Sequence, residues 1–254
     1  MPVLSAAALL ATTLPVALRI RRLRAHAADV PRLAHDLELP GWGSVRTVAV
    51  LGDSAAAGHG LADPELALAR RVGRGLWSLD GRATEVRCAA VSGADTAVVL
   101  ASQLPVARDA EVVVVGVGVN DALSPRRRLR SAERSYDALL DALTAEGGAA
   151  VVAITSPDLS MAPGLPAVLR PVVGWRCRGM ARRQHRVARR HGVVTIALPR
   201  SALPRDVLGD DGFHPGIEGH RRLALAVLRE LAGGDRPAGP TAGEGQAMPA
   251  PSGA

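Results

Sequence analysis

Short apolar runs rich in β-branched residues recur along the middle of the chain. There are five of them, Thr47–Leu51, Val86–Val91, Glu111–Gly116, Ala149–Ile154 and Gly192–Leu198. Each has the length of a strand, and each is apolar at consecutive rather than alternate positions. Such runs are typical of strands that are buried on both faces of a parallel sheet.

The segments between these runs have the periodicity of helices. Apolar residues follow the spacing i, i+3, i+4, i+7 at Tyr136, Leu139, Leu140 and Leu143, and again at Ala224, Val227, Leu228 and Leu231. A third helix is expected over about Val173–His191, because basic residues precede Gly192 as they often do at a helix C-terminus. Strands that alternate with helices predict an α/β fold with a doubly wound parallel sheet.

The length and composition suit one large domain or two small ones. The chain has 254 residues, of which 48% are hydrophobic, enough for a sizeable core. We expect residues 42–232 to form the folded domain. Residues 1–41 are interpreted as an apolar segment followed by an Arg-rich linker. Residues 233–254, rich in Gly, Pro and Ala, are predicted to be a disordered tail.

The apolar segment Val3–Ile20 has about the minimum length that spans a bilayer. Arginines follow it instead of preceding it, so the positive-inside rule predicts a cytoplasmic domain, with membrane association through residues 3–24. A secreted protein is the alternative, because Ala-His-Ala at 25–27 resembles a cleavage site. A loosely packed N-terminal helix is the third interpretation.

The net charge is +7, and every basic side chain is Arg because the sequence contains no Lys. A basic chain could bind nucleic acid or anionic lipid. Aromatic residues make up only 2%, which leaves no surface for base stacking, and no nucleic-acid partner is expected. The Arg-rich stretches 126–130 and 176–190 are interpreted as solvated faces; an Arg-rich membrane-surface binding domain without catalysis is an alternative.

The two cysteines, Cys88 and Cys177, lie far apart and have no CxxC spacing. We expect no metal site on them and interpret both as buried free thiols, with one disulfide as the alternative.

Candidate catalytic residues follow the ends of the predicted strands. Open parallel sheets bind ligands at this edge. The first strand leaves through Gly52-Asp53-Ser54 and the second through Ser92-Gly93, while the third is followed by Asn120-Asp121. A later loop reads Asp211-Gly212-Phe213-His214.

This set of residues fits acyl transfer through a serine. The Ser54 hydroxyl needs a base, which His214 can supply, and Asp211 lies at a spacing that can orient the imidazole. Asp210 competes with Asp211 for that orienting role. The N–H groups of Ser54 and Gly93 and the side-chain amide of Asn120 are candidates for an oxyanion hole.

The four blocks together resemble the SGNH (GDSL) hydrolase family of esterases and lipases, in that family's order. The resemblance covers about residues 47–231. It implies Ser54 as nucleophile, Gly93 and Asn120 in the oxyanion hole, His214 as base and Asp211 as its orienter. It further implies a three-layer α/β/α sandwich around a five-stranded parallel sheet in the order 2-1-3-4-5.

The sequence disfavours the neighbouring α/β-hydrolase superfamily. Its nucleophile elbow reads Gly-x-Ser-x-Gly, whereas Ala56 stands two residues after Ser54 here. We interpret Asp53, Asp121 and Ser92 as structural. The remaining candidate histidines are interpreted as surface residues: His59, His185, His191 and His220.

A Pro-containing segment after the fourth strand carries the apolar side chains of Leu159, Met161 and Leu165. We expect these to line a substrate pocket, with packing on the sheet edge as the alternative. The predicted function is a serine esterase or lipase acting on a small-molecule or lipid ester, with no cofactor or metal. The alternative is an acyltransferase or deacetylase acting on sugar or lipid acceptors. The oligomeric state is left open.

Overall fold

The computed structural model describes residues 35–145, 147–198 and 205–233. Its strands are β1 (Leu37–Leu39), β2 (Trp42–Gly52), β3 (Arg82–Cys88), β4 (Val112–Gly116), β5 (Ala150–Ile154) and β6 (Val194–Ile196). Its α-helices are α2 (Leu68–Asp80), α3 (Thr96–Ser102), α4 (Val119–Leu123), α5 (Leu129–Thr144), α6 (Arg170–Arg190) and α7 (Ile217–Gly233). Short 3-10 helices are η1 (Pro64–Leu66), η2 (Leu104–Ala107), η3 (Leu159–Met161) and η5 (Arg205–Val207).

The predicted α/β fold is confirmed, with a sheet in the order β1-β3-β2-β4-β5-β6. The five predicted strands are β2 to β6, and their neighbours pair in parallel in the predicted order. The sheet has a sixth strand, however. Leu37–Leu39 pairs antiparallel with β3, so the sheet is mixed and begins before the predicted boundary at residue 42. Three residues are too few to show a strand's periodicity, so this strand was missed.

The last strand is shorter than the predicted run over 192–198. Only Val194–Ile196 pairs with β5. Gly192 adopts a φ of +65° in the turn that follows α6, a conformation that glycine accepts without strain. The turn therefore takes up the first residues of the apolar run.

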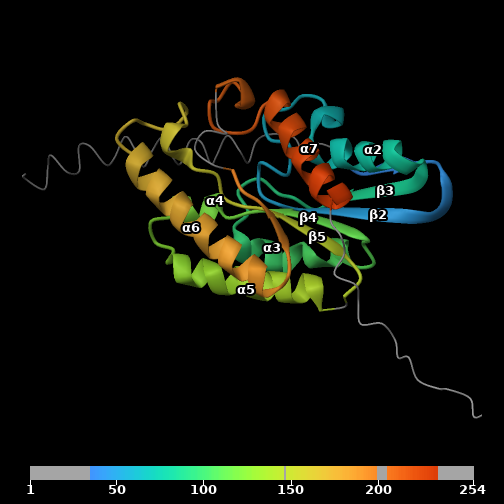
Figure 1. Cartoon of the computed structure of the whole chain (residues 1–254). Helices are drawn as coiled ribbons and strands as arrows, with labels where there is room; N and C mark the ends of the chain where they lie inside the picture. Colours follow the sequence, from blue (N-terminus) through green and yellow to red (C-terminus); the bar gives the residue numbers. More distant parts are fainter. Residues whose placement is uncertain (1–34, 146, 199–204, 234–254) are drawn as a thin grey trace, which may run out of the picture.

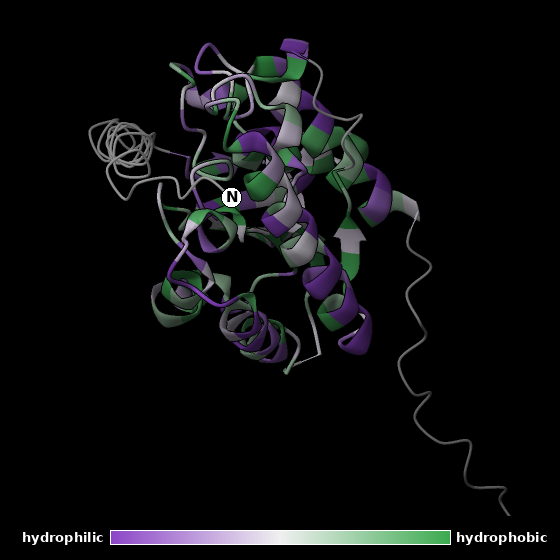
Figure 2. Ribbon diagram, turned by 90° about the vertical axis from the view of Figure 1, so that its left-hand side faces the viewer, coloured by the Kyte–Doolittle hydropathy of each residue, from purple (hydrophilic) through white to green (hydrophobic). Residues whose placement is uncertain are grey.

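Helices cover both faces of the sheet (Figure 1). Val48 and Val50 pack with residues of α2 and α7, whereas Ala49 and Leu51 pack with residues of α3, α5 and α6. Hydrophilic and hydrophobic stretches alternate along the helices (Figure 2). The alternation agrees with helices that bury one face against the sheet and expose the other.

A third apolar cluster lies away from the sheet, where α4, η3 and α6 meet. It contains Leu159, Leu165 and Cys177, all buried. Both cysteines are free thiols; Cys177 is fully buried and Cys88 partly so. Burial raises the pKa of each thiol to about 11, so both remain protonated at neutral pH.

The prediction of a membrane-tethered cytoplasmic domain is not supported. Among the described residues, no helix is both long enough and apolar enough to cross a membrane. The proposed tether, residues 3–24, lies outside the described ranges, and so do almost all residues of the predicted tail at 233–254.

A buried histidine joins the two helices on one face of the sheet. The N–H of Leu68, at the start of α2, donates to Nδ1 of His220 in the first turns of α7, with the two nitrogens 3.2 Å apart. His220 is fully buried, contrary to the prediction of a surface residue. Burial lowers its pKa to about 4, so the ring is neutral in the folded protein.

We therefore expect the stability of this protein to fall as the pH drops from about 6.5 toward 4. In this window His220 is protonated in the unfolded chain but not in the folded chain. The free energy of unfolding therefore falls by on the order of 3 kcal/mol once the pH reaches the folded-state pKa. His220→Asn keeps an acceptor for Leu68 without titrating. Urea unfolding across this pH range should show a flatter stability curve for the variant, and parallel curves would contradict the assignment.

Candidate active site

The exit of β2 depends on a glycine. Gly52 has a φ of +148°, and a Cβ at this position would lie 2.1 Å from the carbonyl oxygen of Gly116 at the end of β4. Since glycine has no Cβ, the two strand ends can approach closely. The N–H of Asp53 then donates to Gly116 O at 3.0 Å. The chain then turns, and Ser54 follows at the carboxyl edge of the sheet.

Three side chains from distant parts of the chain form a hydrogen-bonded relay at this edge. His214 Nε2 lies 3.0 Å from Ser54 Oγ, and His214 Nδ1 lies 2.5 Å from a carboxylate oxygen of Asp211. An ionised carboxylate only accepts, so Nδ1–H donates to Asp211 and Nε2 is left to accept the serine proton. The geometry is that of a nucleophile, a base and an orienting acid.

Asp211, and not Asp210, is the carboxylate that contacts His214. Its other oxygen accepts the N–H groups of Phe213 and His214, both at 2.9 Å, so the loop holds the acid and the base as one local unit. Partial burial raises the pKa of Asp211, but the hydrogen bonds from His214 and the backbone outweigh it and lower the pKa to about 2. Asp211 is therefore ionised throughout the neutral range.

Two further acids have the structural roles that the sequence suggests. Asp53 is buried and accepts the N–H of Ala55 at 3.1 Å, and burial raises its pKa to about 6. Asp121 is also buried and accepts the N–H and the hydroxyl of Thr96 at 3.0 and 2.7 Å. Both carboxylates stabilise the turns from which the site is built.

The two loops that carry the oxyanion-hole candidates are bonded to each other. The side-chain amide of Asn120, near the start of α4, donates to the carbonyl of Ala94 at 2.8 Å. Gly93 precedes Ala94 in a turn and has a φ of +83°, which favours glycine. The Asn120 nitrogen carries a second hydrogen that this bond does not use.

Two buried glutamines, which the sequence analysis did not identify, hydrogen-bond to backbone groups at the strand exits. Gln103 bonds both the N–H and the carbonyl of Gly52, at 2.7 and 3.0 Å. Gln184 of α6 accepts the N–H of Ser156 at 2.8 Å and donates to the carbonyl of Val117 at 2.7 Å. No sequence pattern marks these residues, because each glutamine meets its partners only in the folded chain.

A pocket of about 190 Å³ opens beside Ser54 and His214. Its apolar walls come from the strand exits, η3, the end of η5 and α7, and they include Ile154, Leu159, Leu208, Leu223 and Ala226. Of the three predicted pocket residues, only Leu159 lies on its wall.

The other two predicted pocket residues lie elsewhere. Met161 is 55% exposed, and Leu165 is buried in the cluster beneath α6. Their orientation follows from the way the segment packs on α6, which spacing alone does not reveal.

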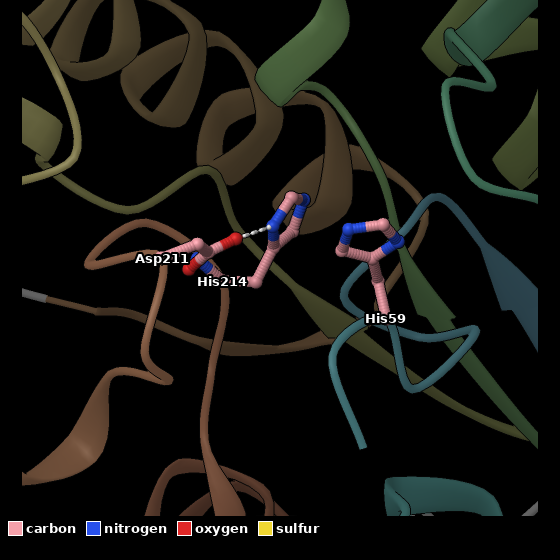
Figure 3. Close-up of side chains that lie close together, drawn as sticks. All are labelled: His59, Asp211 and His214. Atoms are coloured by element: carbon pink, nitrogen blue, oxygen red, sulfur yellow. Dashed lines mark hydrogen bonds and ion pairs between the residues drawn. The ribbon is translucent and has the colours of Figure 1, made fainter. Parts of the chain in front are cut away.

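A second histidine, His59, packs against the relay. It is buried, contrary to the prediction of a surface residue, and its ring centroid lies 4.2 Å from that of His214 with the rings tilted by 50°. Figure 3 shows the His214 ring between Asp211 and His59. His59 Nδ1 lies 3.4 Å from Ser92 Oγ on the neighbouring strand exit. The sequence gave one indication that His59 lies near the relay, namely its position five residues after Ser54.

The Arg-rich stretches carry ion pairs and backbone contacts. Arg183 and Arg186 of α6 both pair with Glu133 of α5. Arg176 donates to the carbonyls of Ala122 and Ser124, at 2.6 and 2.8 Å, and thereby holds the end of α4. Several arginines thus stabilise the fold and the loop after Asn120.

Comparisons with known proteins agree with this architecture. A GDSL-like esterase of Mycobacterium tuberculosis is 27% identical in an alignment of 191 residues that covers 72% of this chain and 60% of the relative, so the chain spans about 60% of the relative's length. The crystal structure of a lipase/acylhydrolase from Enterococcus faecalis covers 74% of this chain and 96% of its own, with a TM-score of 0.61 and 22% identity.

A carbohydrate acetylesterase from Sinorhizobium meliloti has the same fold. Its structure gives a TM-score of 0.56 at 19% identity and covers 74% of this chain and 99% of its own. Residues 50–222, which include Ser54, Asn120 and His214, match the family described as GDSL-like lipase/acylhydrolase. The chain therefore belongs to the GDSL-like lipase/acylhydrolase family.

Proposed function

We propose that this protein hydrolyses carboxylic esters through an acyl-enzyme on Ser54. The observation that carries the proposal is the relay of Ser54, His214 and Asp211, with its contacts of 3.0 and 2.5 Å. A serine hydroxyl is a weak nucleophile until a neighbouring base removes its proton, and His214 is within hydrogen-bond distance to do so.

The first half-reaction forms the acyl-enzyme. Ser54 Oγ attacks the carbonyl carbon of the ester while its proton passes to His214 Nε2, and the carbonyl oxygen becomes an oxyanion. The N–H groups of Ser54 and Gly93 and the Asn120 amide are the proposed donors to that oxyanion. The bond to the alcohol then breaks, and His214 returns the proton to the leaving oxygen.

Water completes the cycle by the same route. It loses a proton to His214 as it attacks the acyl carbon. The tetrahedral intermediate then releases the acid as the bond to Ser54 Oγ breaks, and His214 returns the proton to that oxygen. The imidazolium formed in each half-reaction bonds directly to the Asp211 carboxylate.

The substrate's acyl part is proposed to lie in the apolar pocket beside Ser54. Leu159, Leu223 and Ala226 offer contacts to an alkyl chain. Arg222 also borders the pocket, but it is paired with Asp206 and Glu218 and so does not present an uncompensated charge to an acidic substrate. An alkyl acyl chain fits these walls better than a charged or strongly polar group.

Ser54→Ala should abolish hydrolysis of p-nitrophenyl butyrate, because no other oxygen occupies the position of the nucleophile. A fluorophosphonate probe should label the unmodified protein at Ser54 and leave the variant unlabelled, as peptide mapping will show. Ser102→Ala, which changes an exposed serine on α3, is the matched control and should behave like the wild type. Full activity in Ser54→Ala would exclude the assignment.

Asp211→Asn should lower kcat by about 10³- to 10⁴-fold, because an amide stabilises neither the correct tautomer nor the imidazolium. The matched control is Asp210→Asn, which removes the same charge one residue away without breaking the bond to His214. Steady-state kinetics on one ester tests the pair. Equal rates for the two variants would show that Asp211 does not orient the base.

Ala226→Phe should fill part of the pocket and move the preference toward short acyl chains. Each methylene excluded from apolar surroundings costs about 0.8 kcal/mol, so the ratio of kcat/KM for hexanoate to that for acetate should fall by about 10-fold or more. Leu225→Phe, on the exposed side of the same helix, is the control. An unchanged ratio in Ala226→Phe would place the acyl chain elsewhere.

A further inference from the structure

We propose that His59, His214 and Asp211 bind a transition-metal cation of the Zn²⁺ type, and that this cation switches the esterase off. The sequence alone gave no indication of a metal site. Binding of the ion depends only on the three side chains. The inhibition, in contrast, rests on the proposed function of His214 as the base.

The three side chains converge from two loops. Each offers one ligand atom, and these atoms all lie within 4.8 Å of one another. His59 follows β2, whereas Asp211 and His214 precede α7. In Figure 3 the His214 ring lies between the other two, and a ring nitrogen of His59 is on the side that faces His214.

A bound ion needs a modest closure of this arrangement. Bonds of 2.0–2.2 Å to nitrogen and oxygen require ligand atoms about 3.4 Å apart in tetrahedral geometry. The Asp211 side chain is 34% exposed, so a shift of its loop can bring the carboxylate inward together with the two backbone N–H groups that it accepts. His59 and His214 are already in ring contact. The separations between ligand atoms need to shrink by up to about 1.4 Å to complete the site.

The donor set selects the class of ion. Two imidazoles and one carboxylate suit Zn²⁺ and its neighbours, whereas Mg²⁺ and Ca²⁺ prefer sites made only of oxygen. Contacts behind the ligands support them as in known metal sites. His59 Nδ1 is near Ser92 Oγ at 3.4 Å, and Asp211 accepts two backbone N–H groups.

The ion would compete with catalysis for one lone pair. Coordination at Nε2 of His214 occupies the atom that accepts the Ser54 proton. Coordination at Nδ1 moves the ring's single hydrogen from Nδ1 to Nε2, so Nε2 no longer has a lone pair to accept the Ser54 proton. In both cases Ser54 loses its base, so the metal-bound enzyme is inactive until the ion leaves.

Direct metal binding tests the site without relying on activity. The full-length protein, freed of metal by EDTA and buffer exchange, is titrated with ZnCl₂ by calorimetry and with Co²⁺ by visible absorption. We expect one ion per chain. His59→Phe should weaken binding by at least about tenfold, since loss of a supporting contact alone commonly costs that much.

His185→Phe is the matched control and should bind like the wild type, because His185 is exposed and contacts Thr195 away from the relay. His59→Gln keeps a polar group near Ser92 and serves as a second variant if phenylalanine disturbs folding, which circular dichroism will report. Equal affinities for the His59 and His185 variants, or no binding by the wild type, would overturn the proposal.

Inhibition is measured on hydrolysis of p-nitrophenyl butyrate, with each variant compared with its own metal-free rate. ZnCl₂ should inhibit the wild type reversibly, EDTA should restore activity, and equal MgCl₂ should have no effect. Inhibition undiminished in both His59 variants would overturn the proposal. Hydrolysis by a protein that binds no ion contradicts the metal site alone, whereas specific binding without hydrolysis supports the site and contradicts the proposed function.

Discussion

The carboxyl ends of β2, β4 and β5 impose the constraint on which the site depends. Backbone groups that leave a buried sheet must find hydrogen-bond partners, because an unpaired buried N–H or carbonyl is costly. Gln103 meets this need at Gly52, and Gln184 meets it at Val117 and Ser156. These clamps fix the strand exits relative to one another, so side chains on separate loops can converge within hydrogen-bond distance.

The relay divides into a local and a long-range part. Asp211 and His214 are three residues apart, and the loop's own backbone N–H groups hold the carboxylate in place. The contact of His214 with Ser54 joins residues 160 positions apart in the chain. The local part keeps its geometry through loop structure, whereas the long-range part relies on the packing of α7 against the sheet and α2.

The same concentration of groups underlies both chemistries proposed for the site. A base that must accept a proton needs an exposed lone pair and a nearby carboxylate, and these are also ligands for a borderline metal ion. His59 changes the balance because it adds a second imidazole beside His214. Catalysis and metal binding would then exclude each other, since both require the lone pair of His214.

The sequence by itself determined the parallel strands, their order through the family resemblance, and the residues of the relay. Local sequence patterns indicate these features: runs of valine, glycines at strand exits, and the spacing of Asp211 and His214. Only the tertiary structure decided that Leu37–Leu39 adds an edge strand, that His59 and His220 are buried, and that Ala226 lines the pocket while Met161 does not. Such outcomes depend on which distant element covers a residue, and that information is not contained in the spacing of neighbouring side chains.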